Sequence, residues 1–218
     1  MKVSLVSLTE SRVEGVETPE ELIVYTARVS NPDNQMNMET APKLIRYLLD
    51  NHHYSPFEQV DMGVEIETTR GIAPQILRHW SFSFQEFSQR YASPKDMEIY
   101  PARRQDKKNR QNSIDDLPDE TKRWFQGAQK WVWREASQLY TEAVEKGIAK
   151  EQARFLLPLN VKTKLYMKGN IRDWIFYLKL RLGNGTQLEH QEIAHAILCN
   201  CFMPNFPLIS EVMGWIGE

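Results

Sequence analysis

Cysteine is scarce in this sequence, whose 218 residues include only Cys199 and Cys201. The two lie two positions apart in an apolar stretch, a spacing poorly suited to closing a loop with a disulfide or to completing a zinc site with four ligands. We therefore expect a reducing compartment and two cysteines packed in a helical core. His190 and His195 lie five positions apart and do not share a helix face, so they are expected to be ordinary surface or core histidines and no metal is expected.

Long apolar runs and a strong net charge are also absent. Polar residues interrupt every apolar segment before it reaches membrane-spanning length, and residues 1–8 are too short and too interrupted for a signal peptide. The 27 basic and 29 acidic residues nearly cancel, so the overall charge predicts neither nucleic acid nor an anionic membrane as a partner. These absences favour a cytoplasmic protein in which any anionic ligand binds to a local cluster of residues.

One local cluster of basic residues runs from Arg103 to Arg110, within a stretch at 101–118 that we expect to be a loop. Clustered basic residues can contact the phosphates of RNA or DNA, so a nucleic-acid-binding module is one alternative for this protein. A solvated loop is the favoured interpretation, because no nucleic-acid motif accompanies the run and the molecule is net acidic.

The chain length suits one compact domain over residues 1–218. Two-residue alternation of apolar residues predicts strands, while helical spacing and capping residues predict helices. We expect strands at 3–8, 60–67 and 161–167, and helices at 18–29, 40–51, 72–79, 119–146, 151–158, 171–182 and 188–202. On the long helix at 119–146, Trp124, Trp131 and Trp133 are expected to pack into a core or against a neighbouring subunit. These patterns alone indicate only a mixture of α and β structure.

The densest set of polar side chains lies between Gln75 and Tyr91, where arginines, amides, hydroxyls and a carboxylate alternate with bulky aromatics. Arginines can bind phosphate, amides and hydroxyls can read the edge of a heterocycle, and aromatics can stack on a ring. Together these are the parts of a nucleotide or flavin pocket. From periodicity alone, an amphipathic strand and turn with a solvated polar face explains the window equally well.

The segment from Arg78 to Tyr91 resembles the signature of flavin-dependent thymidylate synthases, R-H-R-x-x-S-x-N-E-x-S-x-R-Y. The arginines at both ends, the histidine, both serines, the glutamate and the tyrosine fall in register. Three further segments resemble the family in the same order along the chain: His53 to Glu58, Ala153 to Asn160, and Arg181 with Gln187 and Glu189. The resemblance therefore spans most of residues 25–195.

This resemblance implies an α/β (α+β) fold with a central, largely antiparallel sheet flanked by helices. It also implies methylation of dUMP to dTMP, with the one-carbon unit from 5,10-methylenetetrahydrofolate and the hydride from NADPH through FAD. The resemblance further implies a homotetramer whose active sites lie between chains. For FAD it implies contacts from Ser55, Arg78, His79, Trp80, Glu86, Asn170, Arg172 and Phe176. For dUMP it implies contacts from Gln75, Arg78, Glu86, Ser88, Gln89, Arg90, Arg154 and Arg181.

Within this set, Ser88 and Arg181 are the expected catalytic residues, and His53 is expected to gate the folate or flavin. Beside the base, Arg181 would stabilise negative charge that develops on the pyrimidine ring.

Three residues depart from the family pattern: Trp80 replaces an arginine, Gln85 replaces an asparagine, and Phe176 stands where a polar flavin contact is common. Trp80 removes a cation that could meet a flavin phosphate, and it can stack on the flavin instead. These changes leave a second enzymatic interpretation open, a related flavin-dependent one-carbon modification of another pyrimidine nucleotide.

Overall fold

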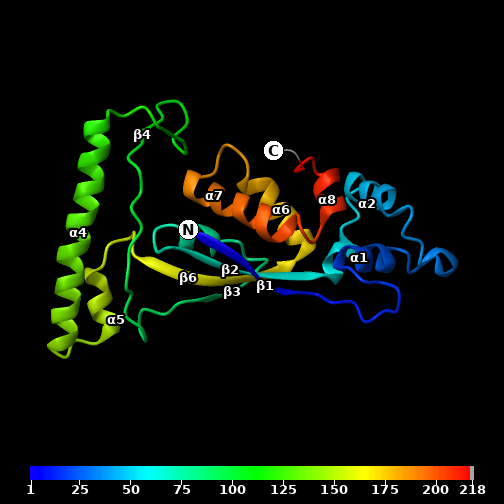
Figure 1. The fold of residues 1–218 in the computed structure, drawn as a ribbon, viewed down its shortest axis with the longest axis horizontal. Helices are drawn as coiled ribbons and strands as arrows, with labels where there is room; N and C mark the ends of the chain where they lie inside the picture. Colours follow the sequence, from blue (N-terminus) through cyan, green and yellow to red (C-terminus); the bar gives the residue numbers. More distant parts are fainter. Residues whose placement is uncertain (217–218) are drawn as a thin grey trace.

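The computed structural model describes residues 1–216, and Figure 1 shows a sheet with helices packed around it. The strands are β1 (Lys2–Leu8), β2 (Asp61–Thr69), β3 (Ser83–Glu86), β4 (Arg104–Gln105), β5 (Ser113–Ile114) and β6 (Lys162–Asn170). The α-helices are α1 (Pro19–Ala27), α2 (Ala41–Asp50), α3 (Ala73–Ile76), α4 (Asp119–Glu145), α5 (Lys150–Ala153), α6 (Ile171–Arg181), α7 (Leu188–Ile197) and α8 (Pro207–Val212). Short 3₁₀ turns occur at η1 (Pro32–Asn34), η2 (Ser55–Gln59) and η3 (Arg154–Leu156), and a π-helical turn, η4 (Leu198–Phe202), continues α7.

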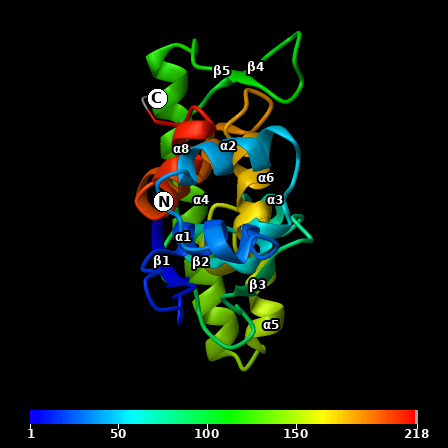
Figure 2. The same cartoon turned by 90° about the vertical axis from the view of Figure 1, so that its right-hand side faces the viewer.

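Four strands form one antiparallel sheet in the order β1-β2-β6-β3. The longest pairing joins β2 to β6, from Asp61 opposite Asn170 to Thr69 opposite Lys162. Helices α6 and α7 lie over one face of this sheet, and α1, α2 and α8 gather at one end of it (Figures 1 and 2). The expected α/β class with a central antiparallel sheet is confirmed.

The sheet separates a buried face from a charged one, because successive side chains of a strand point to opposite sides. Met62 and Ile66 of β2 and Leu165 of β6 are fully buried beneath the helices. On the opposite face, Lys164 of β6 pairs with Glu65 at 2.8 Å and with Glu67 at 3.4 Å. The two-residue alternation that predicted these strands therefore reflects one apolar and one ionic face.

Helix α4 stands beside the sheet rather than over it, with α5 along part of its length (Figure 1). Its bounds agree with the predicted helix at 119–146, and Gly147, with φ of +86°, follows its end. Only Ala136, Tyr140 and Ala143 of α4 are buried, whereas Trp124 and Trp131 are 69% and 58% exposed. Trp124 and Trp131 therefore do not pack into the core of this chain.

Three other expectations need correction, and one helix was not expected at all. Residues 101–118 contain a small hairpin of β4 and β5, in which Arg104 Nη2 lies 2.5 Å from Asp116 Oδ2. Strands of two residues carry no detectable period. The helix expected at 72–79 is the single turn α3. Cys201 is buried but Cys199 is exposed, because two helical positions differ by roughly 200° around the axis.

The unexpected helix is α8, which the sequence patterns did not predict. Its first backbone N–H groups, those of Leu208 and Ile209, donate to the carboxylate of Glu20 at 3.2 and 2.8 Å. A helix of six residues is too short to show a period, and its N-terminal cap comes from α1, far away in the sequence. Within residues 1–216, no helix is both long enough and apolar enough to span a bilayer.

Gly169 of β6 gives a test of how the signature segment is held against the sheet. A Cβ atom at this position would lie 2.6 Å from Phe82 Cδ1, and Phe82 also packs on Trp174 with ring centroids 4.7 Å apart. We expect Gly169→Ala to lower the free energy of unfolding by about 1–3 kcal/mol in urea titrations, because Phe82 must shift.

Gly127→Ala is the matched control, since a Cβ there meets nothing within 4 Å and Gly127 lies inside α4. That change should raise the free energy of unfolding by about 0.5–1 kcal/mol, because alanine favours a helix interior over glycine. Equal stability of Gly169→Ala and the unchanged protein would contradict this account of Phe82.

Candidate active site

His79 and Arg181 meet where the end of α6 approaches the segment that follows α3. Arg181 Nε donates to His79 Nε2 at 2.9 Å, which requires His79 to be neutral with its proton on Nδ1. Burial, together with a smaller effect from the positive charge of Arg181, lowers the pKa of His79 to about 4. The guanidinium of Arg181 is therefore held by a neutral imidazole, so no second positive charge lies beside it.

Behind His79 lies a buried pair formed by Tyr177 and His190. The rings of His79 and Tyr177 meet edge to face with centroids 4.8 Å apart, and the Tyr177 hydroxyl lies 3.0 Å from His190 Nε2. Burial lowers the pKa of His190 to about 3, with smaller contributions from Arg181 and His79, and burial also raises the pKa of Tyr177. His190 is thus a neutral core histidine, whereas His195 is exposed.

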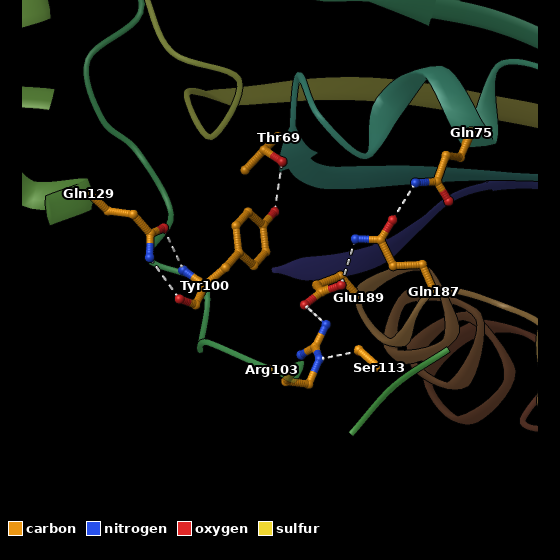
Figure 3. A network of polar contacts seen from close by, with 8 residues as sticks. All are labelled: Thr69, Gln75, Tyr100, Arg103, Ser113, Gln129, Gln187 and Glu189. Atoms are coloured by element: carbon orange, nitrogen blue, oxygen red, sulfur yellow. Dashed lines mark hydrogen bonds and ion pairs between the residues drawn. The ribbon is translucent and has the colours of Figure 1, made fainter. Parts of the chain in front are cut away.

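Gln75 of α3 heads a second chain of polar contacts, drawn in Figure 3. Gln75 Nε2 donates to Gln187 Oε1 at 2.5 Å, and Gln187 Nε2 donates to Glu189 Oε2 at 2.8 Å. The chain ends at Arg103, whose Nη2 donates to Glu189 Oε1 at 2.5 Å. The turn between α6 and α7 is therefore joined to α3 and to the segment that leads into β4.

Two cavities flank this chain of contacts. The first, of about 400 Å³, is mostly apolar and includes Tyr100, Phe125 and Leu159 in its lining. The second, of about 580 Å³, is lined by Arg103 and Glu189 among others. Gln187 borders both cavities, so the amide chain lies where a ligand can reach it.

Another group of expected site residues lies at or near the end of β3 and comprises Glu86, Ser88, Gln89, Arg90 and Arg154. The Glu86 carboxylate accepts from Arg70 at 2.5 Å and from the Thr163 hydroxyl at 3.0 Å. Arg90 pairs with Glu151 at 3.2 Å, and Arg154 Nε donates to the backbone carbonyl of the same Glu151 at 3.1 Å.

Between these groups, Ser88 Oγ accepts from the Arg90 backbone N–H at 3.3 Å. Gln89 is buried, and its Nε2 has no hydrogen-bond partner within residues 1–216. Two arginines and an unsatisfied amide donor thus lie together beside α5.

The expected flavin residues near η2 and the start of α6 also lie together. Asn170 caps α6, because its Oδ1 accepts from the Asp173 backbone N–H at 3.0 Å. Arg172 pairs with Glu58 of η2 and with Asp173, and Phe176 packs on Tyr54 with ring centroids 4.9 Å apart. Ser55 is the first residue of η2, and the His53 ring meets Tyr47 edge to face.

Arg78 and Trp80 of the signature segment are exposed, as are Ser55 and Phe176 among the expected flavin residues. Arg78 is exposed, and the Trp80 residue is 92% exposed. A tryptophan so exposed packs on nothing in its own chain, so its ring is free to contact a ligand or a second chain. Within residues 1–216, no group of three or more histidine, cysteine, aspartate or glutamate side chains is placed to hold a metal ion.

Residues 12–207 match the family model described as thymidylate synthase complementing protein. The chain belongs to this family. It is 51% identical over 219 residues to the probable flavin-dependent thymidylate synthase of Paramecium bursaria Chlorella virus 1, covering 99% of this chain and 100% of that protein. It is 53% identical over 218 residues to the flavin-dependent thymidylate synthase of Synechocystis sp., again covering 99% and 100%.

A solved structure has the same fold as this chain. That structure is described as a UMP/dUMP methylase from Streptomyces cacaoi bound with 5-Br dUMP. It matches this chain with a TM-score of 0.83 and 24% sequence identity, covering 99% of this chain and 95% of that chain. At this identity the likeness shows the shared fold alone.

The residues expected to bind nucleotide in this family member fall into two groups. Gln75 and Arg181 lie at α3 and the α6–α7 turn, whereas Arg90 and Arg154 lie around Glu151 of α5. Within residues 1–216, no hydrogen bond or ion pair joins one group to the other, and α5 lies away from α6 and α7 (Figure 1). One copy of the chain therefore does not bring all the expected nucleotide residues together.

No sequence pattern indicated Tyr100, Gln129 or the pairing of Arg103. Gln129 of α4 accepts from the Tyr100 backbone N–H at 3.0 Å and donates to its carbonyl at 2.8 Å, and the Tyr100 hydroxyl lies 2.6 Å from Thr69 Oγ1. Arg103 was visible only as the first residue of the basic run. Its partner Glu189 lies 86 positions away, so no local signal could have identified the pair.

The neutral states of His79 and His190 predict that the stability of this protein depends on pH. Below the ordinary histidine pKa of 6.5, the unfolded chain binds protons that the folded protein does not, until pH falls to about 3–4. Stability is therefore lost as pH falls through this window. We expect His190→Gln to show a shallower loss than the unchanged protein in urea titrations between pH 6.5 and 4.

His195→Gln, on the same helix but exposed, is the control and should keep the slope of the unchanged protein. If His190→Gln and His195→Gln lose stability with the same slope, His190 is not neutral in the folded state.

Proposed function

We propose that this protein is a flavin-dependent thymidylate synthase, which methylates dUMP to dTMP. The observation that carries the proposal is the full-length identity of 51% and 53% to two proteins of that name. FAD is the proposed cofactor, with NADPH and 5,10-methylenetetrahydrofolate as co-substrates. We further propose that residues 1–218 act as one domain in the cytoplasm.

The chemistry of the exposed residues fits an anionic dinucleotide with an aromatic ring system. Arg78 is exposed and Arg172 is half-buried and paired with Glu58, and both can offer donors to phosphates. Trp80 and Phe176 supply accessible aromatic surface on which a ring can stack. Ser55, His79, Glu86 and Asn170 complete the proposed FAD contacts, and His53 is the proposed gate. When bound, the flavin supplies the hydride chemistry that no amino-acid side chain can supply.

The protein's own part of the proposed reaction is alignment and charge stabilisation. Arg90 and Arg154 offer charge-assisted donors to the nucleotide phosphate, with Ser88, Gln89, Arg78 and Glu86 as further contacts. Gln75 offers a hydrogen-bonding edge, and Arg181 stabilises negative charge on the pyrimidine ring. The hydrogen bond that Arg181 donates to His79 fixes the guanidinium in place, which reduces the reorganisation needed during reaction.

We propose that the complete site forms between copies of this chain in a homotetramer. The two groups of nucleotide residues are separate within one chain, which supports a shared site. Exposed apolar side chains at intervals of seven and eight residues on α4 also support assembly, because such spacing places them near one another on one side of the helix. These are Trp124, Trp131 and Leu139, and Phe155 and Leu159 are further exposed apolar residues.

A second candidate is a related flavin-dependent modification of another pyrimidine nucleotide. The observation that favours it is the exposed Trp80 at a position where the family signature has an arginine. The nucleotide product distinguishes the two candidates.

The first experiment follows the visible spectrum of the purified protein with added FAD. We expect a protein-bound flavin spectrum. With oxygen excluded, we expect reoxidation of the reduced flavin only when both dUMP and methylenetetrahydrofolate are present, with dTMP as the product. A different methylated or hydroxymethylated nucleotide would favour the second candidate. Absence of flavin binding would exclude both, and binding to RNA or DNA that weakens steeply with salt would then favour the nucleic-acid alternative.

Single and mixed variants test the site and its assembly together. We expect Arg90→Ala and Arg181→Ala each to lower kcat/KM by at least about 100-fold, because one loses a phosphate contact and the other loses charge stabilisation. Co-expression of the two variants should restore part of the activity, because a site between chains can receive Arg90 from one copy and Arg181 from another.

Lys179→Ala is the matched control on α6, since Lys179 is exposed and near Arg181 in sequence. It should leave kcat/KM unchanged. Near-normal kcat/KM in both arginine variants would contradict the assigned site, and failure of the mixture to regain any activity would contradict a shared one.

A further inference from the structure

The ion pair between Arg103 and Glu189 is the most enclosed one in this region. The two side chains are 11% and 5% exposed, and Nη2 of Arg103 lies 2.5 Å from Oε1 of Glu189. Arg103 Nε also donates to Ser113 Oγ at 2.7 Å, which joins it to β5. A buried ion pair often adds little net stability over apolar residues of similar size, so a contribution to stability does not by itself account for this pair.

The donors and acceptors in this chain of contacts can be arranged in only one direction. A guanidinium has donors alone, and a carboxylate has acceptors alone. Because Arg103 and Glu189 sit at one end, Gln187 must turn its NH₂ group toward Glu189 and its carbonyl toward Gln75. Gln75 must then turn its own NH₂ group toward Gln187.

The consequence appears at the outer end of the chain. With its NH₂ group held by Gln187, Gln75 directs its carbonyl oxygen elsewhere, and this oxygen accepts no hydrogen bond within residues 1–216. In Figure 3 the Gln75 nitrogen faces the Gln187 oxygen, and no dashed line reaches the Gln75 oxygen. An amide side chain is otherwise free to rotate by 180° and exchange its donor and acceptor.

We propose that the Arg103–Glu189 ion pair acts as a positioning device, which fixes the Gln75 amide so that its carbonyl oxygen meets a hydrogen-bond donor of the bound nucleotide. The proposal rests on the proposed function, in which Gln75 contacts dUMP. It makes Arg103, Gln187 and Glu189 specificity-determining residues that act through Gln75. The donor is a ring N–H of the base or a hydroxyl of the sugar.

Two attachments hold the arginine end of this device. Gln129 of α4 fixes the backbone of Tyr100, three residues before Arg103, through hydrogen bonds of 3.0 and 2.8 Å. Ser113 of β5 fixes the guanidinium from the other side. The hairpin of β4 and β5 and the exposed helix α4 therefore set the direction of an amide in the nucleotide site.

Glu189→Gln tests the proposal because it removes the charge and keeps the shape. The new amide can donate to the Gln187 carbonyl, which lets Gln187 and Gln75 both turn over. Gln75 then presents NH₂ groups where the nucleotide needs an acceptor. With FAD-loaded protein, we expect the Kd for dUMP in calorimetry to rise roughly tenfold, the effect of one mismatched hydrogen bond.

Gln187→Leu interrupts the series of hydrogen bonds between Glu189 and Gln75 at an exposed position, and gives a second, independent variant. We expect a similar loss of dUMP affinity, and we expect the double variant Glu189→Gln/Gln187→Leu to bind no more weakly than Gln187→Leu alone, because the ion pair acts through Gln187. A merely structural role of Glu189 would make the two losses add. Glu192→Gln, at an exposed position on α7, is the control and should bind dUMP as the unchanged protein does.

The outcomes separate the proposal from the proposed function. If the unchanged protein binds FAD but not dUMP, the proposed function fails. If the unchanged protein binds dUMP and Gln187→Leu binds it equally well, the positioning role is wrong. The role is also wrong if the losses of dUMP affinity in Glu189→Gln and Gln187→Leu add in the double variant. A dUMP analogue without the 3′ hydroxyl identifies the donor. If Glu189→Gln and the unchanged protein bind this analogue with the same Kd, the donor is the sugar hydroxyl. If Glu189→Gln still binds it more weakly, the donor is the ring N–H.

Discussion

The pairing of β2 with β6 sets the position of most groups in the candidate site. Its register places Asn170 opposite Asp61, and Asn170 is both the last residue of β6 and the N-cap of α6. Because α6 has 11 residues, Arg181 then lies roughly 16 Å further along the helix axis, beside His79. A slip of one residue would move Met62, Ile66 and their neighbours to the charged face, so burial of the apolar face holds the register.

Two neutral histidines show how the core shapes the electrostatics of the site. Burial lowers the pKa of both His79 and His190, and His79 can accept a hydrogen bond from Arg181 only while it is neutral. The positive charge thus stays on the arginine, at the end of a chain of aromatic contacts that runs through Tyr177 to the core. The same packing that stabilises α6 and α7 therefore concentrates charge at the position proposed for the pyrimidine ring.

Much of the fold could be predicted from local patterns, and the rest could not for identifiable reasons. Alternation predicted β2, local apolar residues predicted β1 and β6, and Thr18 with Pro19 and the acidic first turn marked the start of α1. These signals lie within a few residues of one another. Helix α8 was missed because its N-terminal partner, Glu20, lies on α1. The hairpin of β4 and β5 was missed because its strands have two residues each.

The candidate site divides in the same way. The sequence by itself determined the family, the signature from Arg78 to Tyr91 and the residue types that a nucleotide and a flavin require, since these depend only on the order of residues. Only the tertiary structure decided that Arg181 is held by His79, that Glu189 faces Arg103, and that Arg90 lies with Arg154 apart from Arg181. The physical reason is that hydrogen bonds and ion pairs form between side chains that the folded chain brings within about 3 Å, whatever their separation in sequence.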